Sequence, residues 1–217
     1  ASYPADFFYA HSRLLERSGY FKTDKGIHAI TCLPIAETVE GDITGYIQTN
    51  LMSITDGHIF FDKELFLQGR RPAVNYFLSV TRVGRQTQTK LKWSVGRELS
   101  NFLSLLEKTQ NFVHFGAEIS EGIKSTLLMG EKIINSFFNQ ASGEVLNTNL
   151  QIFIFTLIWS QVFKEQDPQG IAKQISKIVS SYNTDSDYKK RVDTAIESSI
   201  DFNALLGVVS SRHMEFI

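Results

Sequence analysis

Several features are scarce in this sequence, and each scarcity excludes a class of protein. The single cysteine, Cys32, cannot form an internal disulfide, so the chain is not a disulfide-stabilised scaffold, and this usage fits a reducing compartment. Because Cys32 lies in the apolar run AITCLPIA, we expect a small buried hydrophobe there. The chain carries 22 Lys and Arg against 23 Asp and Glu, a formal net charge of -1. This balance argues against nucleic acid or an anionic membrane as a partner of the whole chain.

Long apolar runs are also missing. The longest, LQIFIFTLIW at 150–159, is interrupted by Gln151 and Thr156 and is much shorter than the roughly 20 residues that a membrane-spanning helix needs. We therefore predict a core helix there. The chain opens on ASYPADFFY, with neither an initiator methionine nor a basic signal region, and we expect it to be a fragment or a processed product of a longer polypeptide.

Self-contained catalytic motifs are absent from the sequence. It has no GxxxxGK[ST] phosphate loop, no HExxH, no GxSxG and no CxxC, so no local motif indicates triphosphate binding or zinc ligation, and we predict no metal site. Asp185 and Asp187 lie in a stretch without the rest of a calcium-binding pattern. The five histidines are scattered singly. We expect residues outside this chain to complete any chemistry.

The character of the sequence changes near residue 90, which predicts two domains, 1–90 and 91–217. Between 27 and 82, short apolar runs alternate with turn-rich segments, which is typical of strands and short helices in an α/β sheet. After Trp93 the pattern becomes helical. The predicted fold class is therefore α/β followed by all-α.

Helices are predicted from apolar periodicity and from turn residues. An opening helix would enter through Pro4 and end at Gly19. Later helices are expected over 148–163, 170–182 and 186–206, and before them lie an apolar stripe and a second helical segment that Gly130 would break. The stripe consists of Leu99, Phe102, Leu103 and Leu106.

One arginine stands at the end of an apolar run. Phe77–Thr81 reads as a short buried strand, and Arg82 follows it in FLSVTRVGRQTQTK. Because open α/β sheets present ligand-contacting groups at the carboxyl ends of their strands, Arg82 is a candidate binding residue. The alternative is a rim charge with no chemical role.

Five segments in order carry a family resemblance: YPADFFYAHSRLLER, AITCLPIAETVEGDITGYIQTN, SITDGHIF, GRRPAVNYFLSVTRVG and VHFGAEIS. They resemble segments of the α subunit of the F-type ATP synthase. The resemblance covers residues 1 to about 120, and the rest fits that family's helical C-terminal domain in length.

The resemblance implies the second half of a RecA-like P-loop NTPase domain, followed by a C-terminal helical bundle. The family's phosphate loop and its acidic magnesium-orienting strand would precede residue 1, so this chain alone is expected not to be catalytic. Implied ligands are ATP or ADP with Mg. Implied partners are β-type catalytic subunits in an alternating ring and a central γ-type shaft, with no nucleic acid. The implied location is the membrane-peripheral sector of a proton-translocating complex, at a bacterial inner membrane or a mitochondrial inner membrane.

The resemblance also implies site residues. Arg82 in SVTRVG matches the arginine that the α subunit projects into the neighbouring β subunit's catalytic site, where a guanidinium in trans contributes about 10³ to 10⁵ in rate. The alternative for Arg82 is an interface salt bridge. Ser53 and Gly57 match positions near the phosphate end of that site. Thr55 and Asp56 between them either join the site or only turn the chain.

A second group matches the adenine pocket of the α subunit's own, non-catalytic nucleotide site. Arg71 and Pro72 match that pocket directly, and Phe66 is expected beside them. The family completes the pocket with two glutamines around QGQ, whereas here the aligned stretch is NQAS, so Asn139 and Gln140 would be substitutes.

Other features leave alternatives open. Glu118 and Glu121 would face a basic shaft, or they would only favour a helix start. Departures such as YIQTN at 46–50 suggest a divergent F-like ATPase motor. A RecA-like hexameric nucleic-acid motor also uses arginines in trans, and nucleic-acid-stimulated ATPase activity would identify it. A third alternative is a non-enzymatic interaction module formed by the helical half.

Overall fold

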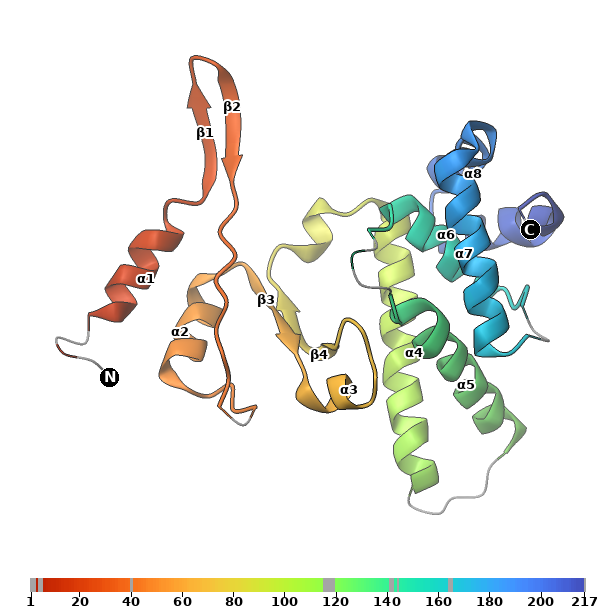
Figure 1. Ribbon diagram of the computed structural model, residues 1–217, viewed down its shortest axis with the longest axis horizontal. Coiled ribbons are helices and arrows are strands. Elements are labelled where there is room, and N and C mark those ends of the chain that lie inside the picture. The colour runs from red at the N-terminus through yellow and green to blue at the C-terminus, as the bar shows by residue number, and fades with distance from the viewer. Residues whose placement is uncertain are drawn as a thin grey trace. The chain divides into compact units, whose positions relative to one another are not determined.

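An α/β portion precedes a mostly helical region in the computed structural model (Figure 1). The structure describes residues 3, 6–39, 41–114, 120–140, 143, 145–163 and 166–216. The chain forms two compact units, 1–68 with 73–84, and 69–72 with 85–217. We call them the α/β unit and the helical unit. The predicted fold class is confirmed, while the predicted domain boundary at residue 90 stays a prediction.

The α/β unit contains two hairpins and short helices. The first hairpin pairs β1 with β2, and the second pairs β3 with β4, both antiparallel. The strand predicted at 77–81 is confirmed as the second half of β4, but its predicted burial is wrong, because Phe77, Leu78 and Val80 are 48%, 41% and 51% exposed. The elements in chain order are α1 (Phe7–Leu15), β1 (Gly19–Thr23), β2 (Gly26–Ile30), α2 (Tyr46–Ile54), β3 (Gly57–Phe61), α3 (Lys63–Leu67), β4 (Val74–Thr81) and the short 3-10 helix η1 (Gly84–Thr87), which continues into the helical unit.

Two local predictions for the α/β unit were wrong. The opening helix ends at Leu15, and Gly19 instead begins β1, where its backbone has the positive φ of 143° that glycine adopts readily. Pro4, the predicted entry, lies outside the described residues. Cys32 is half-buried, because it lies in an extended segment after β2 that makes no regular structure.

The register of β3 and β4 fixes what meets at the end of the second hairpin. Gly57 lies opposite Thr81, and a shift between His58 and Phe60 interrupts the pairing. The Ser79 hydroxyl accepts a hydrogen bond from the Phe60 N–H at 3.0 Å and donates to the Asn75 carbonyl at 2.6 Å. The Ser79 hydroxyl thus provides hydrogen-bond partners at the register shift. The first residue of β3 lies beside the last residue of β4.

The helical unit packs around α6 (Figure 1). Its elements are α4 (Lys90–His114), α5 (Glu121–Lys132), the π-helix η2 (Ile133–Phe138), α6 (Thr148–Trp159), α7 (Pro168–Thr184), α8 (Ser186–Ser198), α9 (Phe202–Arg212) and the 3-10 helix η3 (His213–Glu215).

The predicted core helix is confirmed as α6. Phe153, Ile154 and Leu157 are fully buried, and Phe155 stacks on Phe202 with ring centroids 5.6 Å apart. All residues from Ile152 to Ile158 are buried, Thr156 included, which is the pattern of a helix enclosed by its neighbours rather than one at the surface.

Gly130 does not break the helix that contains it. It lies inside α5 and is buried, and a β-carbon there would meet the side chain of Leu106 on α4. Glycine therefore allows the two helices to approach closely. Leu103 and Leu106 of the predicted stripe are buried, and Leu99 and Phe102 are partly buried against the core.

The predicted helix at 186–206 is in fact two helices. The helix α8 ends at Ser198, and Asp201 caps α9 by accepting a hydrogen bond from the Ala204 N–H at 2.9 Å. The Ser199 hydroxyl bonds back to the Ala195 carbonyl at 2.7 Å. A side-chain acceptor one residue before an apolar run starts a new helix, and the sequence pattern did not reveal this break.

Candidate functional site

The predicted site residues fall into two groups. Arg82, Ser53 and Gly57 lie in the α/β unit, together with Phe66 on α3. The other group, in the helical unit, consists of Arg71, Pro72, Asn139 and Gln140.

Arg82 directly follows β4, and its guanidinium is held at the carboxyl end of α2. Its Nη1 donates to the Ser53 carbonyl at 2.8 Å, and its Nη2 donates to the Met52 carbonyl at 3.2 Å. The last carbonyls of a helix have no partner within the helix and carry its negative dipole end, so they attract a cation. The residue is exposed, and the backbone N–H of Arg82 donates to the Asp56 carbonyl at 2.8 Å.

The remaining donors of this guanidinium are open. A guanidinium has five N–H donors, and the two carbonyls take one from each terminal nitrogen. Among the described residues no further partner of Arg82 is present, so an oxyanion could bind the other donors without breaking either contact. The arrangement holds the guanidinium in one orientation without using up its binding capacity.

Ser53 lies beside Arg82 through its backbone rather than its hydroxyl. The Ser53 hydroxyl donates to the Asn50 carbonyl of its own helix at 2.7 Å, and the side chain is exposed. Thr55 likewise donates to the Leu51 carbonyl at 2.7 Å. In this conformation these hydroxyls serve the end of α2, and the Ser53 carbonyl orients the arginine.

Gly57 allows β3 to approach β4 next to Arg82. A β-carbon at Gly57 would meet the Val80 carbonyl oxygen and would lie 3.0 Å from the Thr81 α-carbon. Backbone atoms cannot move aside as a flexible side chain can, so a larger residue would displace the strand end. The α/β unit thus brings Arg82, Ser53 and Gly57 together at the end of β4, and their role in a shared nucleotide site stays a prediction.

The second group is joined by two hydrogen bonds to the backbone of Arg71, in the helical unit. The Arg71 N–H donates to the Asn139 Oδ1 at 2.9 Å, and the Gln140 N–H donates to the Arg71 carbonyl at 2.8 Å. The Arg71–Pro72 peptide bond is cis, and both residues are exposed. Phe66 lies on α3 in the α/β unit, where about half of its surface is exposed.

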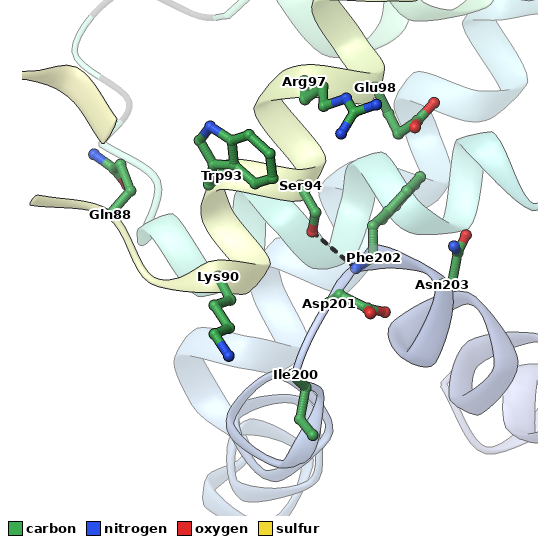
Figure 2. A pocket seen from close by; sticks show the side chains of 10 residues that line it. All are labelled: Gln88, Lys90, Trp93, Ser94, Arg97, Glu98, Ile200, Asp201, Phe202 and Asn203. Carbon is green, nitrogen blue, oxygen red and sulfur yellow. Dashed lines mark hydrogen bonds between the residues drawn. The ribbon is translucent and has the colours of Figure 1, made fainter. Parts of the chain in front are cut away.

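A hollow that sequence reasoning missed lies beside the starts of α4 and α9 (Figure 2). It encloses about 620 Å³, and the Arg97 guanidinium lies 5.6 Å from the Trp93 ring centroid at its wall. The Phe202 N–H donates to the Ser94 Oγ at 2.9 Å, which joins the two helix starts. None of the predicted site residues lines the hollow. The helical period placed Trp93 and Arg97 on α4, but no local pattern indicated that α9 would meet them.

Of the two glutamates predicted to face a shaft, the structure describes one. Glu118 lies outside the described residues. Glu121 is the first residue of α5, directly after Ser120, whose side chain accepts from the Ile123 N–H at 3.4 Å. A glutamate in the first turn of a helix is favourable with the helix dipole, so this position supports the structural alternative.

Metal-ligating clusters and membrane-spanning helices are both missing from the described ranges. In the part of the chain that the structure describes, no group of three or more His, Cys, Asp or Glu side chains is placed to hold a metal ion. Among these same residues, none of the helices combines the length and the apolar character that crossing a bilayer requires.

Comparison with known proteins gives a consistent family. Residues 1–81 match the model of the ATP synthase alpha/beta family, nucleotide-binding domain. The chain is 34% identical over 217 residues to the ATP synthase subunit alpha of Acholeplasma laidlawii, covering 100% of this chain and 43% of that protein. It is 38% identical over 181 residues to the same subunit of Neorickettsia sennetsu, covering 83% of this chain and 35% of that protein.

A eukaryotic relative agrees with the bacterial ones. The mitochondrial ATP synthase subunit alpha of Schizosaccharomyces pombe is 43% identical over 132 residues, covering 61% of this chain and 25% of that protein. The chain spans less than half the length of these relatives. Residues 1–81 therefore belong to the nucleotide-binding domain of the ATP synthase alpha/beta family, and ATP synthase alpha subunits are homologues over most of the chain.

Proposed function

We propose that this chain is a part of the α-type, non-catalytic subunit of a rotary F-type ATP synthase, and that Arg82 acts in trans at the catalytic site of a neighbouring β-type subunit. The observation that carries the proposal is the exposed Arg82 guanidinium, oriented by two carbonyls of α2 and keeping open donors. It lies at the end of β4 beside Gly57, in a chain homologous to ATP synthase alpha subunits.

The proposed chemistry is electrostatic. Phosphoryl transfer spreads negative charge over the oxygens of the transferred group, and a planar guanidinium fixed in advance stabilises that charge without being reorganised during the reaction. The contribution expected for an arginine in trans is about 10³ to 10⁵ in rate, or roughly 4 to 7 kcal/mol. A lysine at Arg82 would present a point charge and would not reproduce the fork.

A second part of the proposal concerns the subunit's own nucleotide site. Arg71, Pro72, Asn139 and Gln140 would contribute to the adenine side of a structural ATP site. The bound species would be ATP or ADP with Mg, whose ligands would come from residues that this chain does not contain. When bound, the ion would neutralise phosphate charge.

The proposed surroundings follow from the same assignment. The chain would alternate with β-type catalytic subunits around a γ-type shaft, in the membrane-peripheral sector of a proton-translocating complex. That sector would face the bacterial cytoplasm or the mitochondrial matrix.

The test is replacement of Arg82 in the assembled complex. We expect Arg82→Ala to lower ATP hydrolysis by at least about 10³, and Arg82→Lys to restore little of it, while subunit assembly and nucleotide binding persist. Arg17→Ala is the matched control, because Arg17 is an exposed arginine just after α1 in the same unit. Unchanged hydrolysis in the Arg82→Ala complex would remove the assignment.

A further inference from the structure

The short segment 69–72 packs with the helical unit, although the residues on both sides of it belong to the α/β unit. Its attachment consists of two hydrogen bonds, from the backbone of Arg71 to the Asn139 side chain and to the Gln140 backbone, which we call the Arg71 bridge. The Arg71 N–H bonds the Asn139 Oδ1 at 2.9 Å, and the Gln140 N–H bonds the Arg71 carbonyl at 2.8 Å. Both backbone polar groups of Arg71 are therefore satisfied by two consecutive residues.

The chemistry of the bridge fixes the orientation of the Asn139 amide. A backbone N–H can pair only with an acceptor, so the oxygen of the Asn139 side chain faces Arg71 and the NH₂ group points elsewhere. The side-chain oxygen supplies an acceptor that a backbone carbonyl would otherwise supply. The amide oxygen of Asn139 is thus engaged in holding the backbone of Arg71.

The bridge is attached to a fixed element. Asn139 directly follows η2, in which Ile133 is fully buried and the buried Ser136 donates to the Pro168 carbonyl at 3.1 Å. One turn earlier, the Lys132 Nζ donates to the Phe163 carbonyl at 3.1 Å. π-helical turns are rare and occur often at functional sites.

Arg70 adds a second attachment next to the bridge. Its guanidinium lies 5.6 Å from the ring centroid of Phe138, the last residue of η2, and burial lowers the pKa of Arg70 below its usual range. Cation–π contacts are stronger where the cation is partly desolvated. In addition, the Arg71 Nη1 donates to the Arg70 carbonyl at 2.7 Å.

We infer that Asn139 is a positioning residue: it fastens the Arg71–Pro72 segment to the helical unit through its side-chain oxygen and does not itself bind the base. The inference rests on the proposed nucleotide role of this segment. Asn139, which stands in place of a glutamine of the family, would then act on the nucleotide only through the Arg71–Pro72 segment. Gln140 would supply the side chain that contacts the nucleotide directly.

The test compares two substitutions of Asn139 in the assembled complex. Asn139→Asp keeps an oxygen acceptor and loses the NH₂ group, whereas Asn139→Ala loses both. We expect amide hydrogen exchange at Arg71 to accelerate about tenfold in Asn139→Ala and to stay near wild type in Asn139→Asp. We also expect Mg-ATP affinity at the non-catalytic sites to fall about five- to tenfold in Asn139→Ala and to be retained in Asn139→Asp. Asn203→Ala, at an exposed asparagine of α9, is the control.

The outcomes separate the inference from the proposed function. Unchanged exchange at Arg71 in Asn139→Ala would overturn the bridge itself. Protected exchange with lost affinity in Asn139→Asp would overturn the positioning role, because the NH₂ group would then be a direct ligand. Accelerated exchange with unchanged affinity in Asn139→Ala would leave the bridge standing and overturn the link of the segment to nucleotide. Arg82→Ala hydrolysis is independent of all three results.

Discussion

The two units of this chain differ in how much apolar surface they bury. In the helical unit, side chains from α4 to α9 share one core, and Phe153, Leu205 and Val209 have no exposed surface. In the described part of the α/β unit, only Ala73 is buried, while Tyr20 is 84% exposed and Phe61 is 66% exposed. The helical unit therefore has the core that an independent domain needs, and the α/β unit does not.

This contrast teaches that apolar sequence and buried structure are separate properties. Strand β3, GHIFF, is as apolar as much of α6, yet its odd-numbered residues Ile59 and Phe61 are two-thirds exposed. Apolar strands of this kind are stable when further elements cover them. The chain spans less than half the length of its relatives, and we propose that the additional residues of the parent subunit cover the α/β unit.

The largest expected effect comes from a pair of phenylalanines, one in each unit. Phe153 is fully buried in α6, with its ring centroid 4.9 Å from that of Phe216. We expect Phe153→Ala to lower the free energy of unfolding by about 3 to 5 kcal/mol, because it removes contacts and leaves a cavity. Urea unfolding followed by circular dichroism measures the change.

Phe61→Ala in β3 is the matched control for that measurement. At this exposed position we expect a change within about 0.5 kcal/mol in the isolated chain. Equal losses for the two variants would mean that the α/β unit has a core of its own, and the contrast between the units would be wrong.

A pair of glycine substitutions tests how closely α4 and α5 pack in the helical core. Gly130→Ala would place a methyl group against Leu106, and we expect a loss of about 1 to 3 kcal/mol from overpacking. Gly96 lies in α4, and among the described residues no neighbouring side chain comes within 4 Å of where its β-carbon would stand, so Gly96→Ala should stabilise by roughly 0.5 to 1 kcal/mol. Thermal unfolding measures both, and the same sign for both variants would contradict the close approach of α4 and α5.

A pair of tyrosines tests the same contrast through pH. Burial, with the hydrogen bond that its hydroxyl donates to Asp193 at 2.8 Å, raises the pKa of Tyr182 to about 12. The unfolded chain releases this proton near pH 10, so between pH 10 and 12 the unfolded state binds fewer protons and stability falls as pH rises.

Tyr182→Phe should make that alkaline loss of stability shallower. The same variant should lower stability at neutral pH, because the Asp193 carboxylate loses a donor. Tyr46→Phe, at an 83% exposed residue of the α/β unit, is the matched control for the loss of a tyrosine hydroxyl. Urea unfolding at a series of pH values provides the slopes, and a Tyr182→Phe slope equal to the wild-type slope would refute the assignment.

Elements with strong local signals could be predicted from the sequence. The apolar run at 150–159 indicated α6, and the alternating run before Arg82 indicated the second half of β4. The break between α8 and α9 could not be predicted, because Ser199–Asp201 interrupts a continuous apolar period by capping rather than by glycine or proline. Gly130 was interpreted wrongly for a related reason. Glycine occurs both where a helix breaks and where two helices pack closely, and the sequence does not distinguish the two cases.

The candidate sites also divide into a part that could be predicted from the sequence and a part that could not. The resemblance singled out Arg82, Ser53 and Gly57, and the hairpin register brings them together. Arg82 is bonded by the Ser53 carbonyl rather than by the Ser53 hydroxyl. This difference depends on where α2 ends. The hollow beside Trp93 was missed because Ser94 and Phe202, which join its two helix starts, lie 108 residues apart.

The sequence by itself determined the change from an α/β portion to a helical one, the apolar core helix and the family, because these depend on local periodicity and on residues read in order. Only the tertiary structure decided that Asn139 pairs with the backbone of Arg71, 68 residues earlier, and that Gly130 faces Leu106. Such pairings depend on how whole helices pack, and the packing is set by many side chains acting together rather than by any one stretch of the chain.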